Sequence, residues 1–76
     1  MPRLPVLSGK EAVEVFLKAG WRYTRTEGSH IVLTRSGYLF SLSVPNHREL
    51  KRGTLRGLIR KAGLSIEEFC NFMKDR

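Results

Sequence analysis

His30 and His47 are the two histidines of this chain and its best candidates for acid–base chemistry. An imidazole exchanges protons near neutral pH, which suits a general base or a general acid. The chain has a single cysteine, Cys70, and no histidine spacing typical of zinc, so the sequence predicts no metal site. It also has no phosphate-binding loop and no dinucleotide glycine pattern. We therefore expect neither a metal nor a small-molecule cofactor, and any acid–base catalysis falls to histidine.

The balance of charge points to a polyanionic partner. Fourteen lysines and arginines stand against seven acidic residues, which gives a net charge of +7 and a pI near 10.4. Nine of the fourteen are arginine, whose planar guanidinium can contact a phosphate through two hydrogen bonds. An acidic protein partner would match the same charge, so charge alone leaves nucleic acid and protein both open.

Basic side chains are concentrated in one segment, between Arg48 and Lys61. Arg52, Arg56 and Arg60 recur every four residues, a spacing that lines one side of a helix. The start of such a helix offers free amides and the positive end of its dipole, with Lys51 and Arg52 beside it. A solvated helix face has the same charge pattern, but its coincidence with a helix start favours a phosphate-binding surface.

These residue types fit the cleavage of RNA. RNA carries its own nucleophile, the 2′-hydroxyl, so cleavage requires positioning, proton transfer and stabilisation of charge at the phosphate. A histidine with nearby arginines supplies these functions without a metal. The simpler interpretation is that His30 is a polar residue between a turn and a strand, bonded to a backbone carbonyl. The residues alone favour this structural interpretation and leave catalysis as the alternative.

The elements that must position these residues follow from hydrophobic spacing and from turn residues. In chain order, we expect a helix over about 9–19, strands over 21–26, 29–35 and 38–44, a helix from an N-cap at Thr54 to Gly63, and a last helix opened by Ser65–Glu68.

The order α-β-β-β-α-α predicts an α+β fold, with a three-stranded antiparallel sheet and helices on one face, in a single domain over 1–76. Glu27-Gly28 and Ser36-Gly37 are typical of turns, and Pro45 should end the third strand. Because Gly28 allows a tight turn, His30 should begin its strand at the sheet's edge, exposed to solvent.

Other features of the chain are ordinary for a small intracellular protein. Trp21 directly follows the first helix and is expected in the core, and Cys70 reads as a small buried hydrophobe. No apolar run has the length needed to span a membrane, and the N-terminus lacks a signal-peptide pattern. We therefore expect a cytoplasmic protein with no membrane partner.

Three segments, taken together, carry a family resemblance. They are Gly28-Ser29-His30, Val44-Pro45-Asn46-His47, and the run LKRGTLRGLIRKAGLS from Leu50 to Ser65. In this order and spacing, within a small basic chain, they resemble the HicA family of toxin mRNA interferases. The resemblance extends from the first helix to Phe69, so it covers nearly the whole chain.

The resemblance implies a double-stranded-RNA-binding-domain-like fold and a metal-independent endoribonuclease that cleaves mRNA and inhibits translation. It also implies a HicB-type antitoxin that binds the toxin and masks its site. The family's catalytic histidine corresponds to His30, and His47 is a candidate accessory residue. The residues expected to contact RNA are Gly28, Ser29, Arg25, Lys51, Arg52 and Arg56.

Two other functions use the same basic surface. One is a non-catalytic RNA-binding module, and the other is an interaction domain that docks an acidic protein. A chain of this size cannot both span a long duplex and enclose a pocket. We therefore expect a shallow, exposed site for single-stranded or locally unpaired RNA, with little discrimination between sequences because few side chains are available to read bases.

Overall fold

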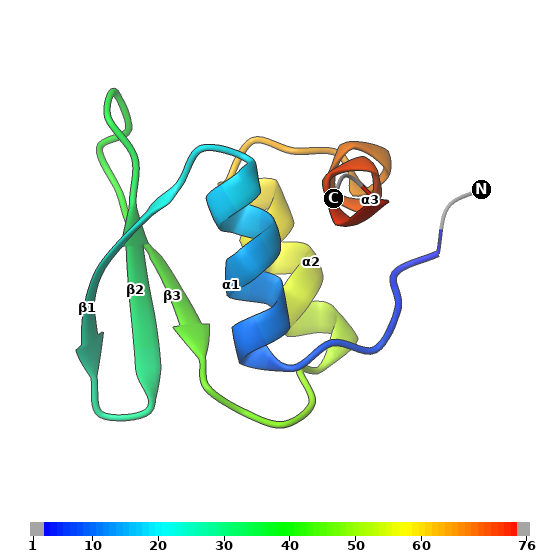
Figure 1. Ribbon diagram of the computed structural model, residues 1–76, viewed down its shortest axis with the longest axis horizontal. Helices are drawn as coiled ribbons and strands as arrows, with labels where there is room; N and C mark the ends of the chain where they lie inside the picture. The colour runs from blue at the N-terminus through cyan, green and yellow to red at the C-terminus, as the bar shows by residue number, and fades with distance from the viewer. Residues whose placement is uncertain (1–2, 75–76) are drawn as a thin grey trace.

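The computed structural model describes residues 3–74, which form a sheet and helices in the predicted order (Figure 1). The elements are α1 (Gly9–Lys18), β1 (Arg22–Glu27), β2 (His30–Thr34), β3 (Leu42–Pro45), α2 (Arg52–Lys61) and α3 (Ile66–Lys74). The sheet has the strand order β1-β2-β3, and both pairs are antiparallel. The predicted α+β architecture is therefore confirmed.

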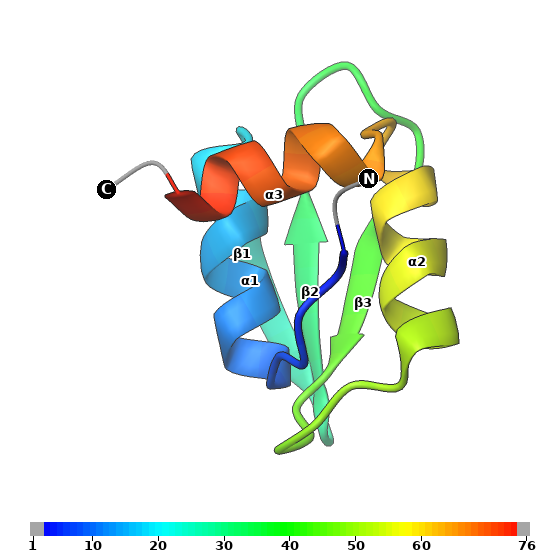
Figure 2. The ribbon, with the colours of Figure 1, turned by 90° about the vertical axis from the view of Figure 1, so that its right-hand side faces the viewer.

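The helices form two layers on one side of the sheet. α1 and α2 pack against the sheet, and α3 lies across both of them on the side away from the strands (Figures 1 and 2). Phe69 of α3 is completely buried, with its ring centroid 5.2 Å from that of Phe16 in α1. Cys70 packs against the core, as predicted, but it is half-buried rather than fully buried.

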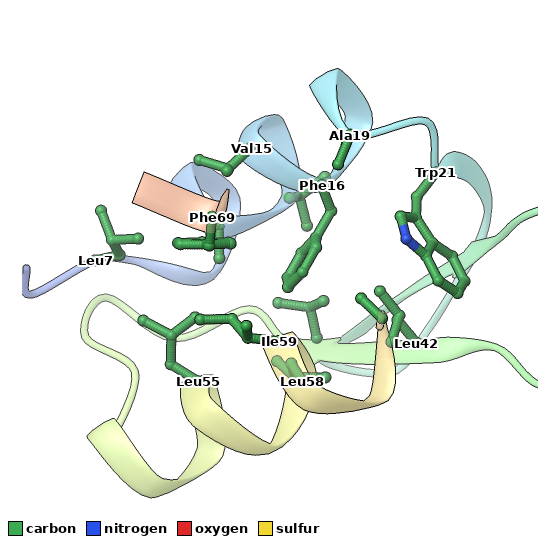
Figure 3. Close-up of a cluster of buried hydrophobic side chains, with 14 of the residues drawn as sticks. Leu7, Val15, Phe16, Ala19, Trp21, Leu42, Leu55, Leu58, Ile59 and Phe69 are labelled. Atoms are coloured by element: carbon green, nitrogen blue, oxygen red, sulfur yellow. The ribbon is translucent and has the colours of Figure 1, made fainter. Parts of the chain in front are cut away.

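The core is built from the helices and from strands β2 and β3, together with Trp21 and the segments that flank the helices (Figure 3). Its members include Leu7, Val15, Phe16, Ala19, Trp21, Leu42, Leu55, Leu58, Ile59 and Phe69. Trp21 is only 2% exposed, which confirms its predicted core role. Every residue of β1 is exposed, so this strand is held by its ladder to β2 rather than by burial.

Two of the three helices have the capping boxes that the sequence predicts. In α1, the Ser8 amide donates to Glu11 Oε1 (2.8 Å) and the Glu11 amide donates to Ser8 Oγ (3.1 Å). The same reciprocal pair joins Ser65 and Glu68 at α3. Each pair satisfies two backbone donors that a helix start otherwise leaves free.

The predicted N-cap of α2 at Thr54 is wrong. The helix begins at Arg52, with Lys51 as N-cap and no side-chain capping bond. The Leu55 amide already donates to the Lys51 carbonyl (3.0 Å), so Thr54 lies inside the first turn. The preceding Leu50 is buried, which fixes where the chain must turn into the helix.

The third strand is shorter than predicted. It starts at Leu42 rather than Tyr38. The predicted turn at Ser36-Gly37 does form, since the Tyr38 amide donates to the Arg35 carbonyl (3.1 Å), but the loop continues to residue 41 before β3 begins. The rings of Tyr38 and Phe40 pack on Trp21, at centroid distances of 5.0 and 6.4 Å, instead of extending the ladder. The chain therefore lies away from β2 over these residues, and it pairs with β2 only from Leu42 onward.

Gly9, the first residue of α1, is a position where one added methyl group should destabilise the fold. A Cβ at Gly9 would overlap the Pro45 carbonyl oxygen, and the Gly9 amide donates to the His47 carbonyl (2.8 Å). Gly9→Ala should therefore lower the free energy of unfolding by about 1–3 kcal/mol, measured by urea denaturation.

Gly57→Ala is the matched control, because Gly57 lies within α2 and a Cβ there would have no neighbour within 4 Å. This variant should gain about 0.5–1 kcal/mol from helix propensity. Equal effects of the two substitutions would contradict the close approach of α1 to Pro45.

Candidate functional site

The β1–β2 turn sets the place of His30. Gly28 has a φ of +58°, and no described residue other than glycine has a positive φ, so Ser29 does not. Glycine first and a negative φ second is the pattern of a type II′ turn, which suits a two-residue hairpin. The turn delivers His30 as the first residue of β2, with its side chain exposed as expected.

His30 begins its strand at one end of the sheet, with its side chain exposed. β2 is the central strand, with β1 and β3 on either side, and His30 stands at its end. Ile31 and Leu33 pack with the helices, so alternation turns His30 and Val32 toward the opposite face of the sheet. We call this face, which no helix covers, the open face (Figure 1).

A β-bulge in β1 decides which of its side chains share the open face with His30. The register shifts between Tyr23 and Arg25, so Thr24 is the extra residue. Beyond the bulge, Arg25 pairs with Val32 and Glu27 pairs with His30. Arg25 and Glu27 therefore lie on the open face, where Arg25 Nε donates to Glu27 Oε2.

The segment that carries His47 is fastened to the same end of the sheet. Pro45 is the register partner of His30, and the Asn46 amide donates to the Ser29 carbonyl (2.7 Å). The His47 carbonyl accepts from Gly9, and its side chain is exposed. The fold thus brings the two histidine-containing segments, far apart in sequence, to one end of the molecule.

The start of α2 lies at this same end, which we call the turn end (Figures 1 and 2). Lys51 and Arg52 are exposed there, and the first turn of α2 contains no acidic residue. Without a side-chain cap, its amides remain available to an anion. The turn end therefore combines histidine, cations and a free helix start.

Arg56 is the predicted RNA-contact residue that stands apart from this group. It lines a cleft between α2 and α3 together with Arg60, Leu64 and Ile66. This cleft lies among the helices and is not part of the open face of the sheet. Arg56 and Arg60 do share one side of α2, as their spacing predicts.

Sequence patterns did not reveal the position of Glu27 at the turn end or the role of Arg35 at the opposite end of the sheet. The sequence pattern predicts Glu27 in the turn, whereas Glu27 is the last residue of β1 and lies directly opposite His30. Arg35 is used internally, because its Nη1 donates to the Ala19 carbonyl (2.8 Å) at the end of α1 and its guanidinium covers the Tyr38 ring. Neither residue carries a local signal, since both assignments depend on contacts between distant segments.

Residues 3–74 offer no cluster of side chains typical of a metal centre. His, Cys, Asp and Glu side chains in this range do not gather in groups of three or more that could hold a metal ion. In the same range, none of the helices has the length and apolar character needed to cross a membrane.

Comparison with known proteins identifies the family. The family described as "HicA toxin of bacterial toxin-antitoxin" has a sequence model that matches residues 9–64, a range that includes both histidines and α2. The chain therefore belongs to the HicA toxin family. Its α3 helix lies outside the matched range.

A solved structure agrees with this assignment. The fold is similar to a chain in the structure titled "Toxin-Antitoxin complex from Streptococcus pneumoniae", with a TM-score of 0.69 and 36% sequence identity. The similarity covers 76% of this chain and 98% of that chain. No curated protein matches the sequence.

Gly28 yields a prediction about the turn itself. A Cβ at Gly28 would meet no atom within 4 Å, so the cost of Gly28→Ala is the strain of a positive φ alone. We expect a loss of about 1–2 kcal/mol in the free energy of unfolding by urea titration. Gly28→Asn should lose less, because asparagine tolerates positive φ better than alanine. Equal losses for both variants would contradict this explanation.

Proposed function

We propose that this HicA-family chain is a metal-independent endoribonuclease that cleaves mRNA, with His30 as its general base or general acid. The observation that carries the proposal is the arrangement at the turn end. An exposed histidine on the open face lies near Arg25, at the same end as Lys51, Arg52 and an uncapped helix start.

The proposed chemistry uses the RNA's own 2′-hydroxyl. Its oxygen bonds to the adjacent phosphorus while its proton passes to a base, and the bond from phosphorus to the 5′-oxygen breaks as that oxygen takes up a proton. His30 would supply one of these two proton transfers. Arg25, Lys51 and Arg52 would stabilise the charge that develops on the phosphate oxygens.

The proposed substrate is single-stranded or locally unpaired RNA. Gly28 and Ser29 would let the backbone of the turn approach the RNA closely, because neither has a large side chain. Arg56 would bind phosphate farther along the strand, at the cleft between α2 and α3. Contacts of this kind hold the RNA backbone and read few bases, so cleavage should discriminate weakly between sequences.

We further propose that a HicB-type antitoxin neutralises the chain, acting in the cytoplasm where mRNA is found. The structural neighbour is described as a toxin–antitoxin complex, and the net charge of +7 favours an acidic partner. An antitoxin that covered the turn end would exclude RNA from His30. A non-catalytic RNA-binding module remains the alternative function of the same surface.

The direct test of catalysis is His30→Ala on a labelled single-stranded transcript with EDTA present. The cleavage rate should fall by roughly 10²–10⁴-fold, because a proton-transfer group has been removed. The far-ultraviolet circular dichroism spectrum should stay unchanged, since the His30 side chain is exposed. His47→Ala is the matched control and should retain its rate, because the fold uses the backbone carbonyl of His47, which the substitution keeps.

Full activity in folded His30→Ala would refute the catalytic assignment. A wild-type protein that shifts the transcript on a gel without cutting it would instead support the binding-module alternative. A loss of rate in His47→Ala comparable to that in His30→Ala would show that both histidines transfer protons.

Salt dependence tests the contribution of the α2 start to RNA binding. Each phosphate neutralised on single-stranded RNA contributes about −0.7 to the slope of log K against log[salt]. The double variant Lys51→Gln, Arg52→Gln should flatten the slope by about 0.7 for each phosphate that it no longer neutralises. Lys74→Gln, at the far end of α3, is the control and should leave the slope unchanged. An unchanged slope in the double variant would exclude the start of α2 from the RNA surface.

A further inference from the structure

Glu27 is an unexpected residue at the proposed phosphate-binding surface. It is the one carboxylate on strands β1, β2 and β3, and it lies on the same face as His30 and Arg25. A negative charge there opposes the approach of RNA phosphates. On this strongly basic chain, a carboxylate at that position calls for a chemical explanation.

The sheet register puts Glu27 directly opposite His30. The two residues flank the two-residue turn, so they form the first cross-strand pair of the hairpin. Side chains of a directly opposed antiparallel pair point to one face, with Cβ atoms about 4.5–5.5 Å apart. At that separation a glutamate side chain and an imidazole ring are long enough to meet in a hydrogen bond.

In the free protein, Arg25 holds this carboxylate. Arg25 Nε donates to Glu27 Oε2, and the two side chains are 54% and 61% exposed. An ion pair this exposed to water is weak, because solvent screens it. A phosphate offers the guanidinium two charge-assisted hydrogen bonds, so a bound RNA strand can draw Arg25 away from Glu27.

We infer that Glu27 is a positioning residue for His30, released for this role when an RNA phosphate takes Arg25. The freed carboxylate accepts a hydrogen bond from one ring N–H of His30. This bond orients the imidazole so that its other nitrogen faces the reacting ribose and phosphate. The inference rests on the proposed ribonuclease function, which it deepens by adding a residue and a change of partner.

The test separates catalysis from binding by using Glu27→Gln. We expect kcat on a labelled single-stranded RNA to fall by roughly 10–100-fold, the cost of a misoriented catalytic group. KM, and the dissociation constant for an uncleavable 2′-deoxy oligonucleotide of the same sequence, should stay the same or decrease. A negative charge has left the surface, and Arg25 is free to bind phosphate.

Two further variants make the outcome decisive. Glu67→Gln removes the same charge from α3, away from the sheet, and should leave kcat unchanged. Glu27→Asp keeps a carboxylate on a shorter side chain and should recover part of the lost kcat. A role limited to repelling RNA phosphates or to stabilising the fold would not produce this split between kcat and affinity, nor the recovery by aspartate.

Several results would overturn the inference. Wild-type kcat in Glu27→Gln would show that His30 needs no carboxylate. A joint loss of kcat and affinity, or loss of the folded circular dichroism spectrum in both Glu27→Gln and Glu27→Asp, would assign Glu27 a structural role. Absence of cleavage by the wild-type protein would reject the ribonuclease function itself, a result distinguishable from failure of Glu27 alone.

Discussion

The close approach of three backbone segments at the turn end is the constraint on which the candidate site depends. The chain at 45–47 lies between the β1–β2 turn and the first turn of α1. The Asn46 amide bonds to Ser29 on one side, and the His47 carbonyl accepts from Gly9 on the other. Only a glycine at position 9 leaves room for the Pro45 carbonyl. The positions of both histidine-containing segments therefore follow from backbone hydrogen bonds and one missing side chain.

The opposite end of the sheet is fixed by different forces. There, Tyr38 and Phe40 pack on Trp21, and the guanidinium of Arg35 and the ammonium of Lys61 lie 5.3 and 5.5 Å from the centroids of the Tyr38 and Phe40 rings. Cation–π contacts and ring packing thus use two basic residues internally. The cations at the start of α2 lie at the other end, away from this aromatic cluster. Arg35 and Lys61 therefore serve the aromatic cluster, whereas Lys51 and Arg52 are exposed at the turn end.

The three helices differ in how the backbone amides of their first turns are satisfied. α1 and α3 satisfy their first amides with their own serine and glutamate side chains, whereas α2 begins with Lys51 and Arg52 and has no acidic residue in its first turn. A helix start that contains cations and lacks a cap forgoes stabilisation of its own dipole. The same arrangement favours an external anion, which the proposed RNA phosphate would provide. The same uncapped, cationic helix start therefore supports the proposed binding of phosphate.

The sequence by itself determined the order of the elements, two capping boxes, the glycine of the turn and the burial of Trp21. These features depend on residue spacing and on the conformational preferences of single residues, which act locally. The tertiary structure alone decided that Thr24 forms a bulge, and this bulge turns Arg25 and Glu27 toward His30. It also decided where β3 begins, because ring packing on Trp21 competes with strand pairing. Register and packing are set by contacts between distant segments, so they leave no periodic signal in the sequence.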